Sequence, residues 1–185
     1  MIVLLNGLSR SGKDTVAKLM VSTMNMRHVK ISENLKRATS AMFGISMDEL
    51  EDHRKDQPSV AFPNVTPRDI LKFLGTDVGQ YEINKLIPNT GRSFWVNRLI
   101  RDMNPASNYV VSDYRYPHEW AAFDTHFPNV PIIRVRVVAK YPGYKMPQKM
   151  DHSERLLACD YTIHNHNIDQ LQKDVILLNE TLLKF

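Results

Sequence analysis

The chain lacks the features of a disulfide-stabilised, membrane-spanning or repetitive protein. Its single cysteine, Cys159, excludes an internal disulfide bond and is typical of a reducing compartment. The apolar run at residues 2–5 is too short to cross a bilayer, and the sequence contains no internal repeat or low-complexity tract. We therefore expect a cytoplasmic protein without a membrane partner.

The sequence also lacks a strong excess of one charge. In its 185 residues, 24 lysines and arginines oppose 20 acidic residues, and no long basic run occurs. This modest positive excess favours small anionic molecules over nucleic acid as partners. With 43% hydrophobic residues, the chain is long and apolar enough to form one domain with a buried core.

The most informative stretch is residues 7–15, which read Gly-Leu-Ser-Arg-Ser-Gly-Lys-Asp-Thr after an apolar strand candidate. A strand, a glycine-bounded turn with a lysine, and a helix candidate match the phosphate-binding pattern G-x-x-x-x-G-K. Gly7 and Gly12 let the backbone curve around a polyphosphate, and Lys13 reaches its outer phosphates. The alternative, a chance glycine turn, is weaker because strand, spacing and helix agree.

The residue after the lysine departs from this pattern. Asp14 occupies the position of the usual Ser or Thr, and Thr15 is displaced by one. Asp14 either holds Mg²⁺ through water or is a favourable acid in the first helical turn, and we favour the second interpretation. The magnesium ligands stay open between Asp14, Thr15 and Asp113.

Strand and helix candidates alternate along the chain, which predicts an α/β fold of three layers with a central parallel sheet flanked by helices. The strand candidates are residues 2–5, 28–31, 109–112, 131–138 and 161–163. Asp113 follows one of these strands. Because ligands gather at the carboxyl ends of parallel strands, Asp113 is a candidate for contact with substrate or magnesium.

We expect residues 1–185 to form a single phosphate-binding domain with two additions. A charged, proline-containing segment at about 45–66 is the expected substrate-side insert. A lid is expected at about 140–152, because residues 140–150 contain two prolines, one glycine and three lysines.

Several segments resemble a deoxynucleoside monophosphate kinase of the phage and large DNA virus type, within the P-loop kinases. They are Arg10–Thr15, Asn34–Lys36, Arg68–Leu71, Leu74–Asp77, Phe94–Val96, and Val110–Arg115 with His118 and Glu119. Animal phosphomevalonate kinases are also similar, at the phosphate loop, Val111–Asp113 and Val135–Ala139. Both families transfer the γ-phosphoryl group of ATP to a phosphorylated acceptor.

The resemblance implies an enzyme that uses ATP and Mg²⁺ to convert deoxynucleoside monophosphates into diphosphates. It implies catalytic roles for Lys13, Arg10 and Asp113. The implied ATP site comprises Gly7, Ser11, Gly12, Lys13, Asp14, Thr15 and Asn165, with Asp14 and Thr15 as metal candidates. The implied acceptor site comprises Lys36, Arg68, Gly75, Thr76, Trp95, Asp113, Arg115 and Glu119. In this assignment Lys36 and Arg68 bind the acceptor phosphate, Trp95 stacks on the base, and the lid closes over ATP.

Three alternatives stay open. One is a kinase for another small phosphorylated acceptor, similar to phosphomevalonate kinase, and a second is a P-loop NTPase that acts as a switch without an acceptor. The third, nucleic-acid binding through the basic excess, predicts steep salt dependence. The resemblance is also compatible with a homodimer and with a viral source, in which case the protein would act in the host cytoplasm.

Overall fold

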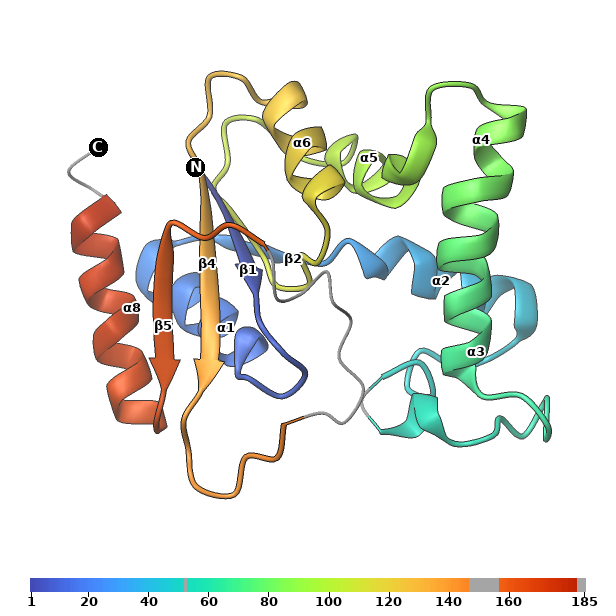
Figure 1. The fold of residues 1–185 in the computed structure, drawn as a ribbon, viewed down its shortest axis with the longest axis horizontal. Helices are drawn as coiled ribbons and strands as arrows, with labels where there is room; N and C mark the ends of the chain where they lie inside the picture. The colour runs from blue at the N-terminus through green and yellow to red at the C-terminus, as the bar shows by residue number, and fades with distance from the viewer. Residues whose placement is uncertain (52, 147–156, 183–185) are drawn as a thin grey trace. The chain divides into compact units, whose positions relative to one another are not determined.

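A computed structural model describes residues 1–51, 53–146 and 157–182, and the chain divides into two compact units (Figure 1). Unit 1 combines Met1–Lys30 with Met103–Phe185, and unit 2 is Ile31–Asp102. The elements of unit 1 are β1 (Ile2–Asn6), α1 (Lys13–Met24), β2 (Arg27–Val29), β3 (Tyr109–Val111), α6 (Pro117–His126), β4 (Ile132–Ala139), β5 (Tyr161–Asn165) and α8 (Ile168–Leu182). Those of unit 2 are α2 (Ser32–Phe43), η1 (Arg54–Asp56), α3 (Pro67–Lys72), η2 (Phe73–Glu82), α4 (Ile83–Leu86), η3 (Gly91–Ser93) and α5 (Phe94–Ile100).

The described strands of unit 1 form one five-stranded parallel sheet in the order β2-β3-β1-β4-β5. Its central strand β1 pairs in register with β3 and β4. Figure 1 shows β1 and β4 side by side. Every residue of β1 and β3 is buried, which explains why these strands read as continuous apolar runs. The sequence prediction of a parallel α/β sheet is confirmed.

One face of the sheet is covered by α1 and α8. The shared core is formed by Val16, Ala17, Met20 and Met24 of α1, Leu171, Val175, Leu178 and Leu182 of α8, and inward-facing residues of the sheet. In α8 these positions recur at three- and four-residue steps, so one helical face supplies the packing. The loop at residues 7–12 joins the end of β1 to the start of α1.

Unit 2 is helical and has its own small core. This core is formed by Ile45, Leu50, Ile70 and Leu74. The long helical stretch 67–86 begins at a capping box, in which the side chains of Thr66 and Asp69 accept hydrogen bonds from each other's backbone amides. The middle of this stretch, η2, is wound as a π-helix, with the Ile83 amide donating to the Val78 carbonyl five residues earlier. π-Helical turns are frequent at functional sites, and this one contains Gly75 and Thr76.

The sequence predicts an insert at about 45–66 and a lid at about 140–152. The expected insert at 45–66 contains turns and the short helix η1, and its role stays a prediction. Of the expected lid at 140–152, residues 140–146 are described without regular structure, while 147–152 lie outside the described residues. No helix in the described part of the chain has the length and apolarity needed to cross a membrane.

Candidate functional site

The loop between β1 and α1 is built around two glycines whose places no other residue can take easily. Gly7 has φ of 143°, and a Cβ there would lie 2.3 Å from the Val137 carbonyl oxygen. Gly12 has φ of 103°, and its Cβ would lie 2.3 Å from the Asn165 side-chain nitrogen. Both positions therefore combine left-handed backbone with a close contact, which is the physical reason for the G-x-x-x-x-G spacing.

Lys13 folds back over this loop. Its Nζ donates hydrogen bonds to the carbonyl oxygens of Gly7, at 2.6 Å, and Leu8, at 2.9 Å. The ammonium group is thus held against the loop backbone, beside the start of α1. A phosphate arriving there meets a positive charge that is already positioned.

The first turn of α1 presents its backbone amides without a side-chain cap. Gly12 is the N-cap residue and has no side chain to accept from these amides. The first amides of a helix have no partner within the helix, and together with the helix dipole they favour an anion. The loop, Lys13 and the helix start therefore point one set of donors toward one place.

Two polar side chains, one in the loop and one at the end of β1, are buried without partners among the described residues. Ser11 Oγ and both polar atoms of the Asn6 side chain have no hydrogen-bond partner among the described residues, although each residue is only 1% exposed. Buried polar groups are normally hydrogen-bonded. These atoms give the loop unused capacity for a polar ligand or water.

Asn165, at the end of β5, contacts the backbone of the loop. Its side-chain Nδ2 donates to the Ser11 carbonyl at 3.0 Å, and the residue is buried. The amide that the resemblance assigns to ATP binding is therefore engaged with the loop backbone. Its contact with adenine stays a prediction.

Asp14 is surrounded by cationic and hydroxyl groups of unit 1. Its Oδ1 accepts from Ser112 Oγ at 2.8 Å and lies 3.0 Å from Lys30 Nζ and 3.8 Å from His28 Nε2. Burial by itself would raise the pKa of Asp14, but the bonds from Ser112 and Lys30 outweigh it and lower the pKa below its ordinary value. Burial also lowers the pKa of His28, with the Lys30 charge acting in the same direction. Asp14 is thus an ionised carboxylate that is already paired.

The segment after β3 places Asp113 and Arg115 beside a buried carboxylate. Glu119, in the first turn of α6, accepts the backbone amides of Arg115 at 2.7 Å and Tyr116 at 3.0 Å. Burial raises the pKa of Glu119 to about 7, the nearby Asp113 charge adds to this, and the two amide bonds oppose it. Glu119 therefore fixes the backbone of this segment, while Asp113 is half-buried and Arg115 is exposed.

In unit 2 the two cations predicted to bind the acceptor phosphate are each paired with a carboxylate. Lys36 is buried, and its Nζ lies 2.5 Å from Glu51 Oε1. Arg68 is exposed and forms a two-point bond with Asp56, with Nη2 3.0 Å from Oδ2 and Nε bonded to Oδ1. Both carboxylates come from the expected insert.

The same unit brings Gly75 and Trp95 together. The Trp95 indole nitrogen donates to the Gly75 carbonyl at 3.2 Å, and the indole lies against Gly79, where a Cβ would come 2.2 Å from that nitrogen. Phe94 packs edge-on to Trp95 with ring centroids 4.8 Å apart. Thr76 is half-buried in the same π-helical stretch. Trp95 therefore has a packing role in unit 2, and its stacking on a base stays a prediction.

Comparison with solved structures identifies the fold. Shikimate kinase from Aquifex aeolicus matches with a TM-score of 0.56 at 12% identity, over 99% of this chain and 98% of that one. The chain has the fold of the P-loop kinases. No model of a known protein family matches it.

One curated relative also matches in sequence. It is a protein of Acanthamoeba polyphaga mimivirus that carries the provisional name deoxynucleotide monophosphate kinase, and it is 25% identical over 123 residues. The match covers 62% of this chain and 64% of the mimivirus protein, so it spans just under two thirds of the relative's length. The similarity that the sequence motifs indicated is thus present in a viral protein.

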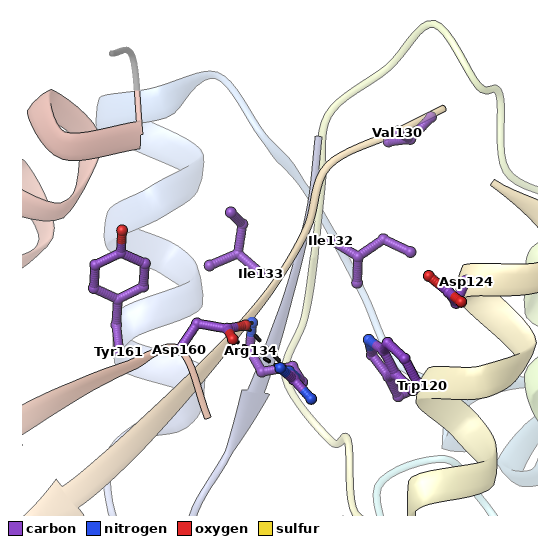
Figure 2. Close-up of a pocket in the computed structure, with 8 residues that line it drawn as sticks. All are labelled: Trp120, Asp124, Val130, Ile132, Ile133, Arg134, Asp160 and Tyr161. Atoms are coloured by element: carbon purple, nitrogen blue, oxygen red, sulfur yellow. Dashed lines mark hydrogen bonds and ion pairs between the residues drawn. The ribbon is translucent and has the colours of Figure 1, made fainter. Parts of the chain in front are cut away.

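A cavity at the amino end of β4 is not part of this site. It has a volume of about 310 Å³ and is lined by Trp120, Asp124, Val130, Ile132, Ile133, Arg134, Asp160 and Tyr161 (Figure 2). It lies at the amino end of β4, whereas the phosphate loop follows the carboxyl end of β1, with which β4 is parallel. Arg134 pairs with Asp160 at 2.7 Å and lies over the Trp120 ring, so these two charged groups of the cavity satisfy one another.

Sequence reasoning missed the residues that hold the loop and Asp14 in place. Ser112, His28 and Lys30 surround Asp14, and two tyrosines of the 140–146 segment bond to the loop backbone. Except for Ser112, which lies in the Val110–Arg115 segment, none of these residues stands in a motif. The available signal was weak: Ser112 precedes Asp113 at the end of a strand candidate, and the tyrosines lie within the expected lid.

Proposed function

We propose that this protein is a kinase that transfers the γ-phosphoryl group of ATP to deoxynucleoside monophosphates and forms the diphosphates. The observation that carries the proposal is the phosphate loop, in which glycine-shaped backbone, uncapped helix amides and Lys13 converge. The name of the mimivirus relative supports the choice of acceptor.

In this proposal the loop amides and Lys13 bind the β- and γ-phosphates of ATP. Phosphoryl transfer needs little covalent chemistry from the protein, because the barrier is lowered mainly by positioning and by neutralising charge. Lys13 would follow the γ-phosphate by exchanging its two carbonyl partners for phosphate oxygens. Arg10, which is exposed on the loop, would approach the transferred group.

The donor set near the loop suits magnesium in part. Mg²⁺ prefers oxygen ligands and usually keeps several waters, binding through one or two protein groups and the nucleotide phosphates. Thr15 and Asp113 supply such oxygens and would hold it, whereas Asp14 is already bound by Ser112 and Lys30. When bound, the ion would neutralise phosphate charge during transfer.

On the acceptor side, Lys36 and Arg68 are proposed to bind the monophosphate. The planar guanidinium of Arg68 already makes a two-point bond to a carboxylate, which is the geometry a phosphate would need. Gly75, Thr76 and Trp95 are proposed to contact the sugar and base, and Arg115 and Glu119 to shape the acceptor side of unit 1.

The test is to incubate the purified protein with ATP and Mg²⁺ and each of the deoxy- and ribonucleoside monophosphates, with phosphomevalonate as a further acceptor, and to separate the products. We expect deoxynucleoside diphosphates, with at least one base preferred. Formation of mevalonate diphosphate alone would replace the proposed acceptor with phosphomevalonate, and hydrolysis of ATP that no acceptor stimulates would favour the NTPase switch.

A further inference from the structure

Two tyrosines outside any sequence motif hold the outer side of the phosphate loop. The hydroxyl of Tyr141 donates to the Arg10 carbonyl at 2.7 Å, and that of Tyr144 donates to the Ser9 carbonyl at 3.2 Å. Their rings pack edge to face with centroids 5.5 Å apart, so the two hydroxyls are presented as a pair. Two successive peptide carbonyls of the loop are therefore held by one small cluster.

Holding a carbonyl also fixes the direction of the amide in the same peptide. A trans peptide is planar, with its C=O and N–H pointing in opposite directions, and the described residues contain no cis peptide. When Tyr144 holds the Ser9 carbonyl, the Arg10 N–H of that peptide is turned to the opposite side of the loop. This amide is therefore aimed away from the tyrosines.

The conformation of Arg10 needs such support. Its φ is 61°, a left-handed value that costs an arginine about 1 kcal/mol or more relative to ordinary backbone. The following peptide is held at both ends, since the Arg10 carbonyl accepts from Tyr141 and the Ser11 amide donates to the Leu8 carbonyl at 3.1 Å. Residues other than glycine keep a left-handed backbone conformation only where the surrounding structure fixes it, often at ligand sites.

We infer that Tyr141 and Tyr144 are positioning residues of the ATP site, whose hydroxyls turn the loop carbonyls of Ser9 and Arg10 outward so that the Arg10 amide faces the nucleotide phosphates. The inference rests on the proposed ATP site and extends it to residues that do not touch the substrate. It predicts that losing either hydroxyl weakens the binding of phosphate groups and leaves the binding of the nucleoside part unchanged.

The experiment compares Tyr141→Phe, Tyr144→Phe and the double variant with the wild-type protein by calorimetric titration with ADP and with adenosine. Each change keeps the ring and removes one exposed hydroxyl, so the fold should persist, and thermal unfolding checks this. We expect each variant to bind ADP about three- to tenfold more weakly, the usual effect of one hydrogen bond, with adenosine affinity unchanged. Tyr161→Phe, a tyrosine of β5 in the same unit, is the matched control and should bind both ligands as the wild type does.

Kinetics and hydrogen exchange provide readouts that a general structural defect would not reproduce. The KM for ATP should rise in both variants while the KM for the acceptor stays constant. Amide exchange should quicken at residues 9–11 and remain unchanged in α8. An equal loss for ADP and adenosine would mean that the tyrosines act on the nucleoside or the whole fold, and would overturn the inference.

The outcomes also separate this inference from the proposed function. Normal ADP affinity in all Phe variants of an active enzyme overturns the inference alone. Weakened ADP binding in a protein that phosphorylates no monophosphate supports the inference and overturns the acceptor assignment. A wild-type protein that binds neither ADP nor ATP overturns both.

Discussion

The proposed phosphate sites of unit 1 and unit 2 are built from different groups. In unit 1 the phosphate loop is built from backbone: glycine turns, helix amides and carbonyls that hold Lys13. In unit 2 the predicted acceptor groups are side chains, Lys36 and Arg68, each already paired with a carboxylate. A backbone site is fixed by the fold, whereas a side-chain site can change with single substitutions.

The difference also separates what each unit can recognise. Backbone amides bind the phosphates that every nucleoside triphosphate shares, so unit 1 suits a constant donor. Side chains on a helical scaffold can be exchanged without altering a turn, so unit 2 suits a variable acceptor. We therefore expect substitutions in unit 1 to affect phosphoryl transfer with any acceptor, and those in unit 2 to affect the choice of acceptor.

The largest effect should come from Lys13→Ala in unit 1. This change removes the ammonium group that we propose follows the γ-phosphate, and loss of one such charged donor costs about 10²- to 10³-fold in kcat. Because Lys13 Nζ bonds to loop carbonyls rather than to the core, the thermal midpoint should change little. Initial rates with ATP and the best acceptor measure the effect.

The matched control is Lys18→Ala, an exposed lysine of the same helix, which should keep its activity. Normal turnover by Lys13→Ala would remove the basis for assigning a phosphate site to the loop. An equal loss in both variants would point to damage of α1 instead.

The same contrast explains how far the sequence could be interpreted. The loop was predictable because left-handed glycines at fixed spacing leave a pattern in the chain, and burial of β1 on both faces leaves a continuous apolar run. The parallel sheet followed from the alternation of strands and helices. By contrast, Asp14 meets Ser112 and Lys30 through contacts that only the folded sheet creates, and no spacing rule announces them.

The next effect concerns Glu119 and pH. Burial raises its pKa from 4.5 to about 7, so between these values the folded state holds a proton that the unfolded state has released. Stability should therefore fall as pH rises from about 4.5 to 7, by about 3 kcal/mol for a shift of this size. Chemical denaturation of the wild type and of Glu119→Gln across this range measures it.

In the Gln variant this titration is absent. The difference in unfolding free energy between the two proteins should therefore change with pH as expected for Glu119 alone. Contributions that the two proteins share cancel in this difference. A difference that does not vary with pH would show that Glu119 titrates normally. Glu119 would then ionise as an exposed carboxylate does, and it would resemble the exposed charged groups of unit 2.

A smaller effect is expected from Arg68→Ala in unit 2. If Arg68 binds the acceptor phosphate, its removal should raise the KM for the monophosphate about tenfold, because charged hydrogen bonds contribute about 1.5–3 kcal/mol before solvent screening. The KM for ATP should not change. Arg37→Ala is the control, since Arg37 is an exposed arginine of unit 2 that pairs with Glu33 within α2.

A rise in the KM for ATP after Arg68→Ala, with the acceptor KM constant, would contradict the division of roles between the units. An unchanged KM for both substrates would place the acceptor phosphate elsewhere. Arg68→Lys sharpens the result, since lysine keeps the charge but lacks the planar two-point geometry, and it should recover only part of the affinity.

The smallest effect should come from Asp14→Asn, which tests whether the first helical turn belongs to the metal site. Asp14 is bound by Ser112 and lies 3.0 Å from Lys30 Nζ, and its side chain is 60% exposed, so its pairing is partly screened by solvent. We expect a loss of stability below about 1 kcal/mol and an unchanged magnesium concentration for half-maximal rate. Titration of Mg²⁺ at saturating ATP measures the latter. A large increase in the magnesium requirement would make Asp14 a ligand, and the phosphate site of unit 1 would then depend on an acidic side chain as well as on Lys13.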